Sequence, residues 1–197
     1  VIDAYDGNFR NASVARAIIA AVEAAVAVKR QNAVPVVPTK ASEEEIGQIS
    51  ALDAIDLSRT CERGVYKKEL AELQSELYDL TYKAYKKGIS STILFEGWDA
   101  AGKGGAIRRL TAGIDARITR VIPVSAPTDE ELAHNYLWRF WRHIPRAGFV
   151  TIYDRSWYGR VLVERVEKLT QPEDWKRAYA ELNDFEEQLQ EHNNILL

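Results

Sequence analysis

Apolar residues recur at spacings of three and four across residues 58–87, which places them on one face of a predicted helix. The stripe consists of Tyr66, Leu70, Leu73, Leu77, Leu80 and Ala84. Gly88 follows at a position where glycine commonly ends a helix. We interpret the stripe as a face buried in the core. The alternative is a contact with a partner helix in an oligomer.

Short apolar runs after this helix predict buried strands, because several of their residues are β-branched. The runs cover 91–96, 119–124 and 148–153. Helical patterns cover 105–110, 128–143 and 173–192. Thr128 and Glu131 form a capping-box pattern at the start of the middle helix. Strands that alternate with helices predict an α/β fold with a mostly parallel, doubly wound sheet.

The first part of the chain has a different character. Residues 13–30 are rich in alanine and predict a helix. Residues 33–44 contain Pro35 and Pro38, which favour extended chain, so we expect a linker and a domain boundary there. The chain has no methionine, and residues 194–197 resemble the start of a strand. We therefore expect the sequence to be a piece of a longer protein.

Composition excludes several classes of protein. The 197 residues are 46% hydrophobic and 28% charged, which is ordinary for a globular protein. There is no apolar run of the roughly 20 residues that a spanning helix needs, so we expect no membrane segment. The one cysteine, Cys61, cannot form an internal disulfide, and cytoplasmic residence fits best.

Residues 97–104 have the spacing of a phosphate-binding loop, with glycines at both ends and Lys103 near the end. The loop lies between a predicted strand and a predicted helix, which is the context that such a loop requires. Glycines let successive N–H groups face phosphate oxygens, and the helix adds its positive end. The predicted phosphate-binding residues are Gly97, Ala100, Ala101, Gly102, Lys103, Gly104 and Gly105.

Gly104 stands where such loops usually have a serine or threonine hydroxyl for Mg²⁺. Another residue must then hold the metal. Asp99 lies inside the loop, where a carboxylate would repel phosphate unless a cation lay between them. Because Mg²⁺ prefers carboxylate oxygens, we predict that Asp99 is a metal ligand. The alternative is that Asp99 makes turn hydrogen bonds.

Asp154 ends a predicted strand about 50 residues after Lys103, where a Walker-B-type acid is expected. Right-handed crossovers would bring it to the sheet edge that carries the loop. It could hold Mg²⁺, or orient or deprotonate the acceptor oxygen. Arg155 and Arg160 suit the charge that develops during phosphoryl transfer. Their alternative role is a structural ion pair with Asp154 or Glu164.

Charge is distributed unevenly along the chain, whose net charge is −3. Residues 98–165 hold 11 lysines and arginines against 7 acidic residues, so the predicted site region is basic. This suits a polyanionic substrate. Nucleic acid fits less well, because no nucleic-acid-binding signature accompanies the aromatic residues of 138–141, which we interpret as core.

Three segments carry a family resemblance. Residues 95–105 read FEGWDAAGKGG, residues 126–128 read APT, and residues 154–160 read DRSWYGR. Together they resemble the family-2 polyphosphate kinases, and the resemblance runs from about Ser58 to the end of the chain. It implies a P-loop kinase fold with three α/β/α layers. It also implies inorganic polyphosphate as the donor, a nucleotide as the acceptor, and Mg²⁺.

Carried over by position, the resemblance implies a catalytic set of Asp99, Lys103, Asp154, Arg155 and Arg160, with metal ligands Asp99 and Asp154. Trp98 and Gly159 resemble the branch in which two such domains are fused and AMP is phosphorylated to ADP. The resemblance then implies that 1–34 is the helical tail of a preceding domain, 35–57 a linker and 58–197 the kinase-like domain. Family members continue past Leu197, so we expect this domain to be incomplete at its C-terminus.

The leading hypothesis is therefore phosphoryl transfer between polyphosphate and AMP. One alternative is a polyphosphate kinase that acts on ADP or GDP. Another is a non-catalytic, polyphosphate-binding half of a tandem protein, although Asp99, Lys103 and Asp154 are all present. The expected partners are polyphosphate and a nucleotide, with no nucleic acid and no membrane, and homo-oligomerisation is left open.

Overall fold

The computed structural model describes residues 6–27, 56 and 58–197. The described residues form a four-stranded parallel sheet in the order β2-β3-β1-β4. The strands are β1 (Ser90–Phe95), β2 (Thr119–Pro123), β3 (Val150–Asp154) and β4 (Asn194–Leu196). The predicted α/β fold with a parallel sheet is confirmed. Residues 194–197, which resemble the start of a strand, provide β4.

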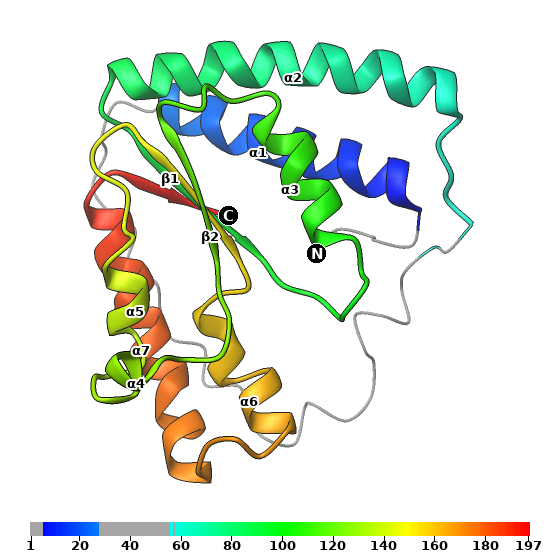
Figure 1. Cartoon of the computed structure of the whole chain (residues 1–197). Coiled ribbons are helices and arrows are strands. Elements are labelled where there is room, and N and C mark those ends of the chain that lie inside the picture. The colour runs from blue at the N-terminus through cyan, green and yellow to red at the C-terminus, as the bar shows by residue number, and fades with distance from the viewer. Residues whose placement is uncertain (1–5, 28–55, 57) are drawn as a thin grey trace.

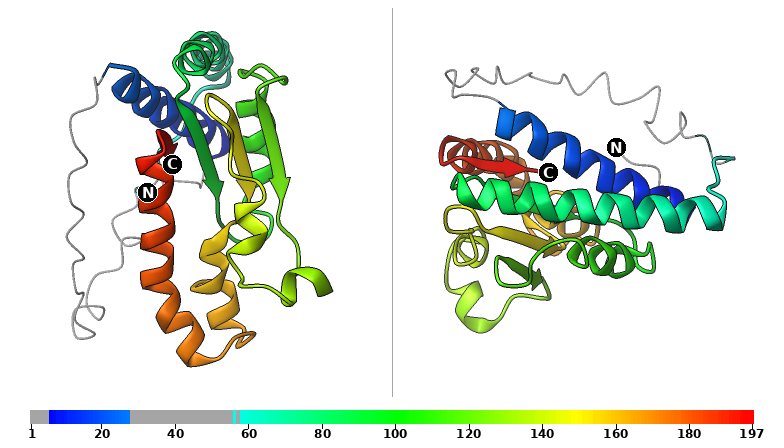
Figure 2. Two further views of the ribbon diagram at one scale, coloured as in Figure 1. Left: turned by 90° about the vertical axis from the view of Figure 1, so that its left-hand side faces the viewer. Right: turned by 90° about the horizontal axis from the view of Figure 1, so that it is seen from above.

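Helices cover both faces of the sheet, so the fold has three layers (Figures 1 and 2). One face carries α1 (Gly7–Ala27), α2 (Arg63–Lys86) and α3 (Lys103–Thr111). The other carries α5 (Trp138–Trp141), the 3₁₀ helix η2 (Trp157–Arg160) and α7 (Pro172–Glu191). The remaining helices are α4 (Asp129–Leu132) and α6 (Val163–Val166).

Alternation along the strands divides the core in two, since successive side chains point to opposite faces. Ile93 of β1 and Ile152 of β3 pack with the helices of the first face. Leu94 and Tyr153, the next residues along, pack with α5 and α7. Ile152 is fully buried, as expected for a central strand of a parallel sheet.

The apolar stripe of the long helix is largely a core face, as interpreted from the sequence. Leu77, Leu80 and Ala84 are buried, and Leu73 packs against the same core while partly exposed. Gly88, just past the helix, has a φ of 68°, which is the left-handed conformation expected of a helix-ending glycine. The stripe thus packs α2 into the core beside the sheet. The view from above shows α2 running over the strands beside α1 (Figure 2).

Helix α1 packs beside α2 and enters the same core. Ile18, Ile19 and Val22 are buried there together with Leu77 of α2. The helix begins earlier than predicted, at Gly7, because Asp6 accepts a hydrogen bond from the Phe9 N–H over 2.7 Å and so caps it. The predicted linker at 33–44 and the end of the predicted helix, 28–30, lie outside the described residues.

The single helix predicted for 128–143 is wrong. The structure has two short helices, α4 and α5, separated by turns. The predicted capping box of Thr128 and Glu131 is present at the start of α4. The Asn135 side chain then accepts a hydrogen bond from the Leu137 N–H over 2.9 Å. Side-chain bonds of this kind compete with helical backbone bonds, which explains the interruption.

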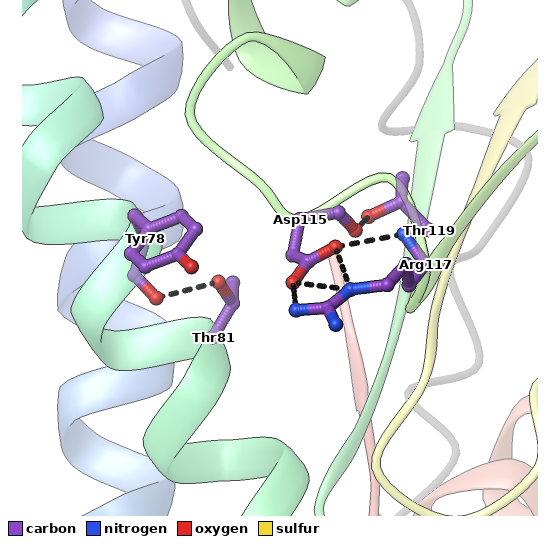
Figure 3. Close-up of polar contacts among 5 residues, drawn as sticks. All are labelled: Tyr78, Thr81, Asp115, Arg117 and Thr119. Atoms are coloured by element: carbon purple, nitrogen blue, oxygen red, sulfur yellow. Dashed lines mark hydrogen bonds and ion pairs between the residues drawn. The ribbon is translucent and has the colours of Figure 1, made fainter.

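The loop from α3 to β2 is held by its own side chains beside α2 (Figure 3). Asp115 accepts hydrogen bonds from the backbone N–H and the guanidinium of Arg117, and its carbonyl accepts one from the Thr119 hydroxyl over 3.0 Å. Hydrogen bonding to Arg117 lowers the pKa of Asp115 to about 2. The turn thus leads the chain into β2 with its carboxylate charged.

No helix in the part of the chain that the structure describes is both long and apolar enough to cross a membrane.

Candidate active site

The carboxyl ends of the parallel strands meet at one edge of the sheet, and a cleft of about 370 Å³ opens there. Phe95 at the end of β1 pairs with Asp154 at the end of β3, and Pro123 of β2 pairs with Asp154 from the other side. The residues that line the cleft are Asp99, Ala100, Ala101, Gly102, Lys103, Gly104, Pro123, Val124, Asp154 and Arg155. The cleft therefore joins the predicted phosphate loop to the predicted Walker-B-type acid.

The loop has the backbone of a phosphate cradle. Ala100 and Gly102 have φ values of 59° and 86°, so the chain turns sharply inside the loop. Gly102 is also the residue before α3, which begins at Lys103. The positive end of α3 therefore faces the cleft, where an anion would be stabilised.

Lys103 is folded back on the loop. Its ammonium donates hydrogen bonds to the carbonyl oxygens of Gly97 and Trp98, each over 2.9 Å. These acceptors are neutral, and a phosphate oxygen would be a stronger acceptor for the same group. A phosphate chain bound at the loop would therefore favour exchange of these carbonyl contacts for phosphate contacts.

Two of the predicted catalytic residues, Asp99 and Asp154, line the same cleft. Asp99 is exposed, whereas Asp154 is half-buried at the end of β3. Among the described residues, no group of three or more histidine, cysteine, aspartate or glutamate side chains is arranged to hold a metal. Mg²⁺ commonly uses one or two carboxylates and completes its shell with substrate phosphates and water. The two carboxylates beside a phosphate cradle fit that donor set.

Arg155 and Arg160 lie in different surroundings. Arg155 is exposed and lines the cleft, as predicted. Arg160 is not among the described residues that line it. Its guanidinium pairs with Glu164 at 3.0 Å, donates to the Thr170 hydroxyl over 2.7 Å and lies over the Tyr136 ring. The ion pair with Glu164 is the alternative that the sequence left open for this residue.

Glu96 was not predicted as a site residue, yet it ties the two halves of the site together. One of its carboxylate oxygens accepts hydrogen bonds from the backbone N–H of Ser156 over 2.6 Å and from its hydroxyl over 2.8 Å. Arg155 has a φ of 68° and donates its N–H to the Phe95 carbonyl. The strained turn that presents Asp154 and Arg155 is thus held by the residues just before the phosphate loop.

The tryptophans of the two motifs serve different purposes. Trp157 is 1% exposed, packs on Phe185 and donates its indole N–H to Glu186 over 2.8 Å. It anchors the segment after Asp154 in the core. Trp98 is 87% exposed and directly precedes Asp99, which lines the cleft. Burial raises the pKa of Tyr158, next to Trp157, above its ordinary value.

Comparison with known proteins places this site in a family. The family model for polyphosphate kinase 2 (PPK2) matches residues 60–197, which include the phosphate loop and Asp154. The chain belongs to the polyphosphate kinase 2 family. The predicted family and its P-loop kinase-like fold are therefore confirmed. Kinases of this family generally need a divalent metal.

Relatives named as polyphosphate-dependent phosphotransferases match different shares of the chain. A polyphosphate:AMP phosphotransferase of Pseudomonas aeruginosa is 44% identical over all of this chain and 40% of its own length. One of Acinetobacter johnsonii is 38% identical over all of this chain and 39% of its own. A GDP-polyphosphate phosphotransferase of Mycobacterium tuberculosis is 38% identical over 64% of this chain and 42% of its own. The chain spans about 40% of the length of these relatives.

Solved structures of the family share the fold. A polyphosphate kinase 2 of Pseudomonas aeruginosa is 53% identical and superposes with a TM-score of 0.71, covering 74% of this chain and 32% of that one. The polyphosphate kinase 2 of Arthrobacter aurescens is 30% identical with a TM-score of 0.70, covering 83% of this chain and 62% of that one.

Proposed function

We propose that the protein transfers a phosphoryl group between inorganic polyphosphate and a nucleotide, with AMP as the preferred acceptor and ADP as the product. The observation that carries this proposal is the cleft in which a phosphate loop that carries Asp99, and has Gly104 in place of a hydroxyl residue, lies beside the carboxylate of Asp154. The identity of 44% over the whole chain to a polyphosphate:AMP phosphotransferase supports AMP as the acceptor.

The loop and α3 hold the phosphate chain at the reacting end. Backbone N–H groups of residues 100 and 102–105 bind phosphate oxygens, whereas the Ala101 N–H donates to the Trp98 carbonyl over 3.2 Å. Lys103 moves from the Gly97 and Trp98 carbonyls to bridge two phosphoryl groups. Arg155, exposed at the cleft wall, balances the charge that spreads over the transferred phosphoryl group. These donors recognise a phosphate chain without contacting a base.

Asp99 and Asp154 would hold Mg²⁺, and Asp154 lies closer to the sheet. When bound, the cation neutralises charge on the phosphate oxygens and so lowers the barrier to attack. Asp154 also orients the acceptor oxygen. Asp99 brings negative charge into a phosphate site, which favours a role beside a cation.

Arg160 remains part of the proposed catalytic set, but in this structure it faces Glu164, Thr170 and Tyr136. To meet substrate, it would have to leave the ion pair with Glu164. The pair is partly buried, with 18% and 34% side-chain exposure, so strong charge-assisted hydrogen bonds to phosphate oxygens would have to replace it.

The second candidate is transfer to ADP or GDP. It is favoured by the relatives named for those acceptors, such as the GDP-polyphosphate phosphotransferase of Mycobacterium tuberculosis. That relative matches 64% of this chain, whereas the AMP-type relatives match all of it. Cytoplasmic residence stays a prediction, and homo-oligomerisation stays open.

A matrix of donors and acceptors tests the proposal. The full-length protein is incubated with Mg²⁺, either polyphosphate or ATP, and AMP, ADP or GDP, and the nucleotides formed are separated and quantified. The proposal predicts the fastest reaction with polyphosphate and AMP. Formation of ADP from AMP with ATP, but never with polyphosphate, would overturn the assignment of polyphosphate as the donor. A higher kcat/KM for ADP or GDP would establish the second candidate.

A further inference from the structure

Helix α1 reaches the phosphate loop through Arg10. The Arg10 guanidinium donates a hydrogen bond to the carbonyl oxygen of Ala101 over 2.9 Å, although the two residues are 91 positions apart. Helix α1 precedes residue 60, where the match to the family model begins. An element outside the family model therefore contacts a residue that lines the cleft.

The fit between Arg10 and the loop is close. A Cβ atom at Gly102 would lie 2.6 Å from both terminal nitrogens of the Arg10 guanidinium, which is shorter than real Cβ contacts. Gly102 also has a φ of 86°, a conformation that favours glycine. The absence of a side chain at Gly102 thus serves two ends: it permits the turn and leaves room for the guanidinium.

The direction of the hydrogen bond suits anion binding. The Ala101 carbonyl and the Gly102 N–H belong to the same peptide group. A cation at the carbonyl polarises that group and makes its N–H a stronger donor. Arg10 therefore makes the Gly102 N–H a stronger donor for phosphate. It also holds the Ala101 carbonyl on the side of the loop that faces α1.

Arg10 is presented by a rigid element. Asp6 caps the first turn of α1, one turn from Arg10. Asn11, the next residue, is buried and donates to the Tyr66 hydroxyl of α2 over 3.3 Å. Further along, Ile18 and Ile19 pack in the core with Ile107 of α3. The helix that bears Arg10 and the helix that follows the loop are thus fixed to each other.

We propose that Arg10 is a positioning residue of the phosphate loop, so that α1 is a working part of the active site. Arg10 acts through the Ala101–Gly102 peptide and preorganises the loop for the phosphate chain, not for the nucleotide base. The inference rests on the proposed function, because it deepens the account of how the donor is bound. The AMP-type relatives match the whole chain, α1 included.

Two measurements on the full-length protein test this role, with variants Arg10→Ala and Arg10→Lys. The control is Arg16→Ala, which removes an exposed arginine of the same helix that pairs with Glu69. The first measurement is calorimetric titration with inorganic tripolyphosphate in MgCl₂ and, separately, with AMP. The second is amide hydrogen exchange of the ligand-free protein, read over residues 98–104.

Arg10→Ala is expected to weaken tripolyphosphate binding on the order of tenfold and to leave AMP binding unchanged. Arg10→Lys should bind tripolyphosphate more tightly than Arg10→Ala but less tightly than the wild type. Lysine keeps the positive charge but lacks the planar guanidinium with its several donors. Exchange in Arg10→Ala should become faster over 98–104 and stay unchanged in α2 and α7. Arg16→Ala should behave like the wild type in both measurements.

Tripolyphosphate binding and loop exchange equal to the wild type in Arg10→Ala would overturn the inference. So would faster exchange throughout the protein, because Arg10 would then serve general stability. If the wild type itself does not bind tripolyphosphate, the proposed function fails, and the exchange measurement still decides whether Arg10 orders the loop. The two failures are thus distinguishable.

Discussion

At the scale of single residues, Lys103 carries the largest expected effect on catalysis. Its ammonium rests on the carbonyls of Gly97 and Trp98 and lies at the cleft. Lys103→Ala should lower kcat/KM by about 10²-fold or more, because a main charge contact to the transferred group is lost. Steady-state kinetics with polyphosphate and AMP measure this. The matched control is Lys67→Ala, which removes an exposed lysine of α2. A rate equal to that of the wild type in Lys103→Ala would refute the role of the loop.

A variant at Asp99 can distinguish the role of a metal ligand from that of a residue that makes turn hydrogen bonds. Asp99→Asn should raise the Mg²⁺ concentration needed for half-maximal activity by at least about tenfold, because an amide oxygen is a weaker ligand for a hard cation. Titration of activity with MgCl₂ checks this. Asp184→Asn, at an exposed position of α7, should leave the Mg²⁺ requirement as it was. The metal role is wrong if both variants respond alike.

Glu96 links catalytic geometry to stability. Ser156 is 3% exposed, and its N–H and hydroxyl both donate to one oxygen of Glu96. Glu96→Ala should lower the free energy of unfolding by about 1–3 kcal/mol, the cost of leaving a buried donor without an acceptor. Glu96→Gln should cost less, because its amide oxygen still accepts. Urea denaturation of the two variants gives the answer, and equal stability of Glu96→Ala and wild type would exclude this linkage.

At the scale of elements, the segment between α5 and β3 should make stability depend on pH. Burial, followed by the nearby charges of Arg142 and Arg120, lowers the pKa of His143, and its buried Nδ1 has no hydrogen-bond partner among the described residues. The folded protein therefore prefers neutral His143. The contribution of neutral His143 to the free energy of unfolding is complete above the pKa of about 6.5 that histidine has in the unfolded chain. It declines as the pH falls, because the unfolded chain takes up the proton first.

Thermal unfolding between about pH 7.5 and 5 measures this effect. The melting temperature should fall as the pH is lowered, and His143→Gln should flatten part of that slope. His192→Gln, at the exposed end of α7, serves as the control and should retain the slope of the wild type. A slope unchanged in His143→Gln would show that His143 does not contribute.

Elements whose signal is local could be predicted from the sequence. Strand β1, the loop and α3 follow one another as expected, because apolar run, glycines and helix pattern lie within 22 residues of chain. The helix over 128–143 could not, since the interruption depends on where the Asn135 side chain finds a donor. Apolar periodicity predicts which face of a helix is buried, but it does not predict side-chain hydrogen bonds that interrupt the helix.

The same limit applies to the candidate site. Asp99, Lys103, Asp154 and Arg155 were found because strand ends and motif spacing place them at one edge of the sheet. Arg160 was expected beside them, but the 3₁₀ turn of η2 directs it to Glu164 and Thr170. Contacts of this kind depend on how the chain turns after β3, which spacing alone does not give.

At the scale of the whole molecule, α1 shares one hydrophobic core with α2, α3 and the sheet (Figure 1). The assignment of 1–34 to a preceding domain and of 35–57 to a linker stays a prediction. Arg10 shows why the origin of α1 matters for function, since its contact with Ala101 crosses that predicted boundary. Long-range contacts of this kind carry no signal in a single sequence.

The central claim is that the cleft transfers a phosphoryl group from polyphosphate to a nucleotide. The most direct measurement is ³¹P NMR of the full-length protein with AMP, polyphosphate and Mg²⁺ and without ATP, recorded over time. The β-phosphate signal of ADP should grow as polyphosphate is consumed, and Lys103→Ala should suppress this growth. No ADP signal with the wild-type protein, or an equal signal with Lys103→Ala, would contradict the central claim.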